Sequence, residues 1–327
     1  MSKEVMERLA ALKDNVVIEL HDVTKDYGHG RGIFDISLKI PKGCVFGYCG
    51  TNGSGKTTTL RHIMGFLKPD KGYVRVNGLD PWKNGEEIKK SIGYLPGEIA
   101  FPPVDNGSDF LKSQAELIDL KDMSKAERII NALQLDPTAN LKRMSKGMKQ
   151  KTALVEAFMI QPEILILDEP TTGLDPLMRK AFIDLIKEEK AKGTTIFMSN
   201  HMFDELEETC DYVAFIKDGH IIDIVDMEEI HSRPFREYEI TFFDKDDYDS
   251  ADTSQVELIE KDDKNLKLII KLDLYKTDGM IRELKKHNIR SIVERQYTLE
   301  KYFLEHVKGE EKNGTSKSKR KEKTIHF

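Results

Sequence analysis

Short apolar runs separated by polar turns dominate the first hundred residues. Runs rich in Val and Ile and bounded by Gly, Asp or Lys predict β-strands, and a run without charged positions predicts a strand buried on both faces. Residues 44–48 form such a run, which leads into a glycine-rich segment and then a helical pattern at 59–67. The predicted strands are 16–20, 23–28, 36–40, 44–48, 73–76 and 91–96, with a hairpin turn at Asn77-Gly78.

Between residues 105 and 160 the apolar positions recur at helical spacing instead. This change predicts a helical subdomain inserted into the sheet. Strands and helices alternate again afterwards, and this alternation predicts an α/β fold with a parallel sheet. The elements expected here are a strand at 163–169, a helix at 177–190, a strand at 194–199 and a hairpin at 213–224.

A third pattern begins near residue 232, where three strand-like runs precede a helix, a strand and a helix. It predicts a small α+β accessory domain over 232–307, beside a main domain over 16–231. Apolar positions at helical spacing (Val5, Met6, Leu9 and Leu12) predict an N-terminal helix over 1–15. The tail 308–327 has no apolar residue before Ile325, so we expect it to be disordered and basic.

Composition narrows the class of protein. Charged residues make up 33 % of the chain and hydrophobic residues 39 %, as in soluble globular proteins. No run approaches the ~18 apolar residues that span a bilayer, and no apolar signal segment follows Met1. The formal net charge of −6 does not favour a nucleic-acid partner. Three cysteines make no disulfide framework. We therefore expect a cytoplasmic protein that reaches a membrane only through a partner.

The glycine-rich segment has the form of a phosphate-binding P-loop. A buried strand precedes it, Gly-Lys-Thr ends it, and a helix follows. Its glycines let backbone N–H groups surround phosphate oxygens, while Lys56 is expected to reach the β- and γ-phosphates and Thr57 to ligate Mg²⁺. A glycine-rich turn that holds a lysine by chance is disfavoured by the full spacing. The predicted phosphate-binding residues are Gly50, Thr51, Asn52, Gly53, Ser54, Gly55, Lys56, Thr57 and Thr58.

Two carboxylates follow the apolar run at 164–167. Asp168 is placed to hold the Mg²⁺ shell, and the adjacent Glu169 can polarise a water molecule for attack on the γ-phosphate. The alternative is that these are merely two solvated carboxylates at the end of a strand, and the presence of a P-loop in the same chain strongly disfavours it. Ser145 can cap the helix that begins after it, so its hydroxyl, the Gly147 N–H and the helix dipole form a second anion site.

Together these motifs resemble the ATP-binding subunit of an ATP-binding-cassette (ABC) transporter, in its bacterial multidrug-exporter-like branch. The resemblance covers about residues 16–230 and implies a P-loop NTPase cassette with an inserted helical subdomain. Residues 50–58 resemble the family's Walker A motif and residues 164–169 its Walker B motif with the catalytic Glu. The other matches are a variant signature at Ser145, Lys146, Gly147 and Met148, the D-loop at Asp175, the switch histidine at His201 and the adenine-stacking aromatic at Tyr27.

One position departs from the family pattern. Where family members carry Gln after a strand, this chain has Gly97 followed by Glu98. Glycine supplies no side-chain oxygen for Mg²⁺ or water, so whether Glu98 replaces the Gln stays open. In the family this loop faces the membrane permease, and residues 96–103 are therefore the expected coupling loop. Residues 297–304 also resemble an element of the export branch, although a plain amphipathic helix explains them equally well.

The resemblance implies a mechanism in which two cassettes form a head-to-tail homodimer around ATP. The P-loop of one copy and the signature of the other would clamp each ATP. Catalysis would involve Glu169, His201 and Lys56, with Thr57 and Asp168 at the metal. The dimer would drive a separate permease, as an exporter subunit on the inner face of the cell membrane. The rivals are a soluble ABC protein acting on ribosomes or DNA and a P-loop GTPase, for which no Asn-Lys-x-Asp segment is visible.

Overall fold

The computed structural model describes residues 15–254, 256–273 and 277–305. It divides between Met227 and Glu228 into two compact units, which we describe separately. The expected N-terminal helix lies outside the described residues except for Asn15, and the expected basic tail lies wholly outside them.

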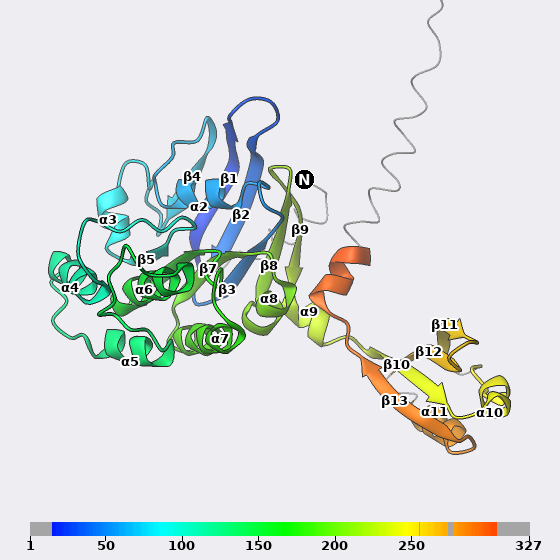
Figure 1. Cartoon of the computed structure of the whole chain (residues 1–327). Helices are drawn as coiled ribbons and strands as arrows, with labels where there is room; N and C mark the ends of the chain where they lie inside the picture. The colour runs from blue at the N-terminus through cyan, green and yellow to red at the C-terminus, as the bar shows by residue number, and fades with distance from the viewer. Residues whose placement is uncertain (1–14, 255, 274–276, 306–327) are drawn as a thin grey trace, which may run out of the picture. The chain divides into compact units, whose positions relative to one another are not determined.

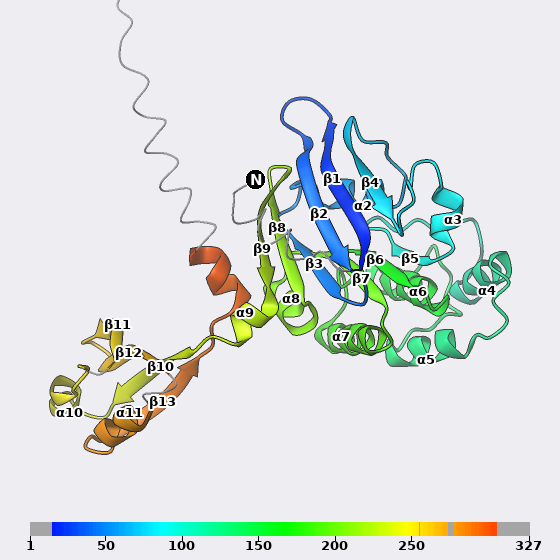
Figure 2. The ribbon, with the colours of Figure 1, turned by 180° about the vertical axis from the view of Figure 1, so that it is seen from behind.

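A six-stranded sheet forms the centre of the first unit, in the order β5-β6-β7-β3-β8-β9 (Figures 1 and 2). All pairs are parallel except β8 with β9. The three middle strands β6, β7 and β3 are buried at every residue, as their largely apolar sequences without internal charges predict. The strands are β3 (Val45–Cys49), β5 (Ile92–Leu95), β6 (Ile164–Asp168), β7 (Thr195–Asn200), β8 (Tyr212–Lys217) and β9 (His220–Asp226).

A second, antiparallel sheet has the order β2-β1-β4, with β1 (Val16–Asp26), β2 (Gly32–Pro41) and β4 (Lys71–Val76). The two strands predicted at 16–20 and 23–28 are one strand with a register shift between Leu20 and Val23. The predicted hairpin at Asn77-Gly78 is wrong, because only one isolated bridge, between Val76 and Leu79, forms across the turn. Beyond this bridge the Asp80 carboxylate accepts the Trp82 N–H in a turn, and β4 pairs with β1 instead.

Helices surround the central sheet and include the inserted helical segment. Side chains of Asn106, Ser145 and Asp175 cap the helices α4, α6 and α7, which explains where each begins. Helix α6 packs on α4, α5 and β5. The helices are α2 (Lys56–Ile63), α3 (Gly85–Lys89), α4 (Gly107–Leu117), α5 (Ser124–Ala132), α6 (Lys146–Met159), α7 (Pro176–Ala191), α8 (Phe203–Thr209) and α9 (Met227–His231), which spans the division between the units.

The second unit is a four-stranded antiparallel sheet in the order β11-β12-β10-β13. Its core contains Ile240, Phe242, Tyr248, Leu268 and Ile270. Helix α10, capped by Asp244, was not predicted from its polar sequence. The elements are β10 (Phe235–Phe242), α10 (Lys245–Ser250), β11 (Glu257–Asp262), β12 (Lys267–Asp273), α11 (Thr277–Leu284), β13 (Ile289–Arg295) and a helical turn at 299–305. No helix among the described residues combines the length and apolar content that a membrane span needs.

Candidate active site

The P-loop lies between β3 and α2, and its geometry suits an anion. Gly55 at the N-cap of α2 has a left-handed backbone, and no side chain caps the N–H groups of the first turn. Gly53 also has positive φ, with open space where a Cβ would be. The buried Ser54 hydroxyl has no hydrogen-bond partner among the described residues. These free donors are what phosphate oxygens require.

Two P-loop glycines are also required by packing, a role that the sequence did not reveal. A Cβ on Gly50 would lie 2.4 Å from the Ile216 carbonyl oxygen, and a Cβ on Gly55 would lie 2.6 Å from the Ile33 side chain. The Gly219 N–H also donates to the Ser54 carbonyl. The loop is therefore held between β2 and the β8–β9 turn as well as shaped for a ligand.

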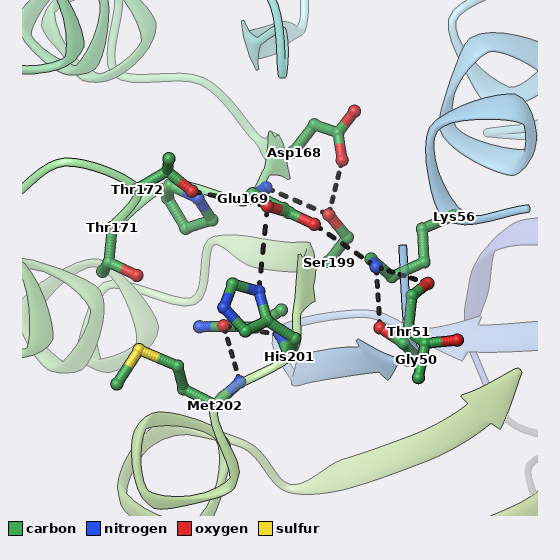
Figure 3. A network of polar contacts seen from close by, with 12 residues as sticks. Gly50, Thr51, Lys56, Asp168, Glu169, Thr171, Thr172, Ser199, His201 and Met202 are labelled. Carbon is green, nitrogen blue, oxygen red and sulfur yellow. Dashed lines mark hydrogen bonds and ion pairs between the residues drawn. The ribbon is translucent and has the colours of Figure 1, made fainter. Parts of the chain in front are cut away.

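Lys56 is 5 % exposed and reaches across the P-loop (Figure 3). Its ammonium donates to the carbonyl oxygens of Gly50, at 2.7 Å, and Thr51, at 3.2 Å. It also lies 3.3 Å from Oε1 of Glu169. The cation is thus positioned between the P-loop and the carboxylates that follow β6.

Asp168 is 1 % exposed and accepts hydrogen bonds from two hydroxyls. Thr57 Oγ1 donates to Oδ2 at 2.7 Å, and Ser199 Oγ donates to Oδ1 at 2.5 Å. Residues 57 and 168, distant in the chain, are therefore in direct contact, as the metal-site prediction requires. Burial raises the pKa of the neighbouring Tyr94 to about 12, and the negative charge of Asp168 adds to this rise.

Glu169 adopts a left-handed backbone with φ 48°, which is uncommon for a residue with a Cβ and is typical of functional sites. Ser199 holds this conformation, because its hydroxyl and its carbonyl both accept the Glu169 N–H, at 3.0 and 3.2 Å. Oε2 of Glu169 lies 3.7 Å from Nδ1 of His201, whose side chain is 52 % exposed. The structure thus brings Lys56, Asp168, Glu169 and His201 together at the ends of β6 and β7.

A second layer of polar residues supports these two strand ends. Asn200 Oδ1 accepts the N–H groups of His201 and Met202, and its amide donates to Glu205 of α8. Gln150 of α6 donates to the carbonyl oxygens of Glu169 and Pro170. Sequence reasoning missed Gln150, Ser199, Asn200 and Glu205 as contributors to the site. Ser199 and Asn200 directly precede His201, which was the one available signal.

The signature residues lie at the start of α6. The Ser145 hydroxyl accepts the Met148 N–H at 3.2 Å, while Ser145 and Lys146 are exposed. A Cβ on Gly147 would lie 2.6 Å from the Gly173 carbonyl oxygen, so the signature packs directly on the loop before Asp175. Asp175 caps α7 through the Met178 N–H at 3.0 Å, which gives it a structural role as well. Signature and D-loop thus share one surface of a single chain.

Three predicted site residues remain: Tyr27, Gly97 and Glu98. Of these, Gly97 lies against the Asp168 carboxylate. Tyr27 is 47 % exposed at the end of β1, so its ring is accessible. Glu98 is exposed. Gly97 lies directly against the metal-site carboxylate, because a Cβ at this position would be 2.8 Å from Oδ2 of Asp168. A larger residue at position 97 would therefore require the Asp168 carboxylate to shift.

Comparison with known proteins identifies the chain. Residues 33–172 match the family model described as ABC transporter. Over 225 residues the chain is 31 % identical to the bacitracin transport ATP-binding protein BcrA of Bacillus licheniformis, a match that covers 67 % of this chain and 72 % of that protein. The chain belongs to the ABC transporter family.

Solved structures agree with this assignment. An ATP-binding subunit of an ABC transporter superposes with a TM-score of 0.59 at 28 % identity, covering 66 % of this chain and 92 % of that one. The dimeric ATP-binding cassette MJ0796, bound to ADP and Pi after hydrolysis, shares the fold with a TM-score of 0.56 at 22 % identity, covering 64 % and 98 %.

The chain is therefore an ATP-binding subunit of an ABC transporter and an ATPase, with the cassette fold of that family. The sequence-based predictions of family, fold and activity are confirmed. The alternative of a soluble ABC protein acting on ribosomes or DNA is not favoured.

Proposed function

We propose that this chain is the ATP-hydrolysing subunit of an exporter whose membrane permease is a separate polypeptide, and that it works as a homodimer. The observation that carries the proposal is the convergence of Lys56, Thr57, Asp168, Glu169 and His201 beside an uncapped helix N-terminus. Supporting evidence for the transport role is the relative named for bacitracin transport. The direction of transport, export, follows from the sequence resemblance.

The roles of the residues follow from their positions. Lys56 would exchange its bonds to the Gly50 and Thr51 carbonyls for phosphate oxygens, since it already spans the loop. Glu169 would accept the proton of the attacking water, because its carboxylate lies beside Lys56 and His201, the two side chains proposed to contact the phosphates. His201 would contact the γ-phosphate from its exposed position. Tyr27 would stack on adenine.

Mg²⁺ fits the oxygen donors of this site. Thr57 Oγ1 and Asp168 Oδ2 are 2.7 Å apart, and Mg²⁺ in such sites is typically bound by one or two carboxylates together with substrate phosphates and waters. No group of three His, Cys, Asp or Glu side chains within the described ranges could hold a metal by itself, which suits an ion that arrives with the nucleotide. The bound ion would neutralise charge that develops on the phosphates.

The proposed homodimer uses the exposed start of α6. Ser145 and Lys146 face solvent, and the adjacent N–H groups and helix dipole favour an anion. The γ-phosphate bound to the P-loop of a second copy would supply that anion. Asp175, on the loop that packs against Gly147, would approach the same interface. The dimeric cassette of similar fold is consistent with this arrangement.

Permease contact would involve residues 96–103. Phe101 packs on Phe110 of α4, with ring centroids 4.8 Å apart, so this loop is connected mechanically to the helical subdomain. Glu98, which follows Gly97, is exposed, and we propose that it contacts the permease. Through this contact the chain would lie on the inner face of the cell membrane. The second unit would form an accessory domain.

Affinity purification of the tagged chain from solubilised membranes tests the proposed partner. We expect a protein with several membrane spans to copurify with the wild-type chain. Recovery of ribosomal proteins or DNA instead of a membrane protein would contradict the assignment. In a purified complex, Glu98→Ala should reduce ATP-driven transport and leave the basal ATPase of the isolated chain largely intact. Loss of basal hydrolysis with ATP binding preserved would place Glu98 in the chemical site instead.

Sedimentation tests the proposed dimer. Glu169→Gln in the presence of ATP should sediment as a dimer, and adding Ser145→Arg should return it to the monomer. Lys42→Arg, at an exposed turn position far from the signature in sequence, is the control and should leave the dimer intact. A dimer that persists with Ser145→Arg would exclude the signature from the interface.

A further inference from the structure

Two loops must keep their relative position for the proposed chemistry. One loop follows β6 and carries Glu169, and the other follows β7 and carries His201. Their side chains approach within 3.7 Å between Oε2 of Glu169 and Nδ1 of His201. A long contact of this kind is too weak to hold two loops, so other groups must define the geometry.

The conformation of the His201 loop depends on one amide side chain. Asn200 Oδ1 accepts the His201 N–H at 2.7 Å and the Met202 N–H at 3.0 Å. Rotation of the Asn200 side chain would break both bonds. The Asn200 amide nitrogen donates to Oε2 of Glu205 at 2.6 Å, which fixes the orientation of the amide.

The same oxygen of Glu205 holds the other loop. Thr171 Oγ1 donates to Oε2 of Glu205 at 2.7 Å. Thr171 lies two residues after Glu169, and its carbonyl accepts the Leu174 N–H just before Asp175. A single carboxylate oxygen on α8 therefore joins the segment that leads from Glu169 to the D-loop with the segment that carries His201.

Stability alone gives a poor reason for this carboxylate. Glu205 is 5 % exposed, and its Oε1 accepts no hydrogen bond from any described residue. The nearest cation is Nε of Arg179, 3.9 Å away, and that group already donates to the Leu174 carbonyl. Burying a carboxylate with incomplete partners costs free energy that an apolar side chain would avoid. Its placement at the junction of the two loops offers a different reason.

We propose that Glu205 is a positioning residue for ATP hydrolysis, which holds His201 and the Glu169–Asp175 segment in register through Asn200 and Thr171. It acts through these residues and touches neither nucleotide nor water. This inference rests on the proposed role of His201 in the site. A displacement of about 1 Å at a catalytic group can reduce a rate by ~10²-fold, so loss of the register should lower kcat.

The first test compares three substitutions in the full-length chain. Glu205→Ala should lower kcat by ~10–100-fold and change the KM for ATP little, because the P-loop is not involved. Glu205→Gln should retain most activity, since one amide oxygen can accept both donors. Glu208→Gln on the same helix, where Glu208 pairs with Lys187 at the surface, is the matched control. Equal losses for Ala and Gln, or a rise in KM at unchanged kcat, would overturn the proposal.

A double-mutant cycle separates positioning from general stabilisation. If Glu205 aligns the two loops, adding Glu205→Ala to His201→Ala should lower kcat by less than it does in the wild-type chain, because only the Glu169–Asp175 segment is left to be displaced. Multiplication of the two losses would refute the coupling. If Glu205→Ala does not fold, Thr171→Val removes one of the two hydrogen bonds with little change in shape and enters the same cycle.

Hydrogen exchange distinguishes failure of this inference from failure of the proposed function. Without nucleotide, Glu205→Ala should increase exchange in both residues 170–175 and 199–203 relative to Glu208→Gln. If His201→Ala retains wild-type turnover, the proposed role of His201 in hydrolysis is wrong. The increase in exchange in both segments would still show whether Glu205 joins the two loops. Increased exchange in only one segment, or in α8 alone, would show that Glu205 does not join the loops.

Discussion

Glu156 is a half-buried carboxyl in the middle of α6, the helix that begins with the signature. Burial raises its pKa from the ordinary value of 4.5 to about 7. Glu156→Gln keeps the shape and removes the titration, and Gln has nearly the same helix propensity as Glu. We expect this substitution to stabilise the first unit at alkaline pH.

The magnitude follows from the two pKa values. Each tenfold change in proton affinity corresponds to about 1.4 kcal/mol, so a rise from 4.5 to about 7 corresponds to roughly 3 kcal/mol. The folded state binds the proton more tightly than the unfolded chain. Wild-type stability therefore falls as pH rises from 4.5 towards 7, and the full cost remains above that range. Since Glu156 is partly exposed, we expect a gain of about 1–3 kcal/mol at pH 8 and less than about 1 kcal/mol at pH 5.

Urea unfolding of the full-length chain at both pH values measures this difference. The single tryptophan, Trp82, lies in the first unit, so its fluorescence reports the unfolding of the unit that contains Glu156. Glu116→Gln, on an exposed position of α4, is the control and should show no such pH-dependent gain. An equal effect of Glu156→Gln at pH 5 and pH 8, or a loss of stability at pH 8, would refute the reasoning.

Three further substitutions test the site and the attachment of the helical segment. Glu169→Gln should reduce turnover by ~10²–10⁴-fold with ATP binding retained in an equilibrium assay, and near-normal turnover would exclude Glu169 as the base. Gly97→Ala should lower Mg²⁺-dependent hydrolysis by up to ~100-fold, because its Cβ would lie 2.8 Å from Asp168, whereas Gly85→Ala, with more space, should not. Lys125→Met should destabilise the first unit by ~2 kcal/mol in urea unfolding, because the buried Glu189 on α7 loses its 2.9 Å partner on α5 and keeps only Lys192; unchanged stability would contradict this.

The amino-acid sequence by itself determined the features that depend on neighbouring residues. The P-loop was predictable because an apolar strand, glycines, Gly-Lys-Thr and a helix occur in one short stretch. The caps at Ser145 and Asp175 were within reach of sequence reasoning for the same reason, since a cap bonds an N–H group three residues away. The three buried central strands were predictable because strands covered on both faces are rich in apolar residues and carry no charge in their interior.

Tertiary structure decided the features that join distant segments. Glu205 looks like any acidic residue of a short polar helix, and only the fold places its carboxylate on Thr171 and Asn200. Gly97 seemed to be a lost ligand, whereas the fold places it so close to Asp168 that an added Cβ would meet the carboxylate at 2.8 Å. The physical reason is the same in both cases. Each property belongs to a contact between chain segments, and a linear sequence records the participants of such a contact without their separation in space.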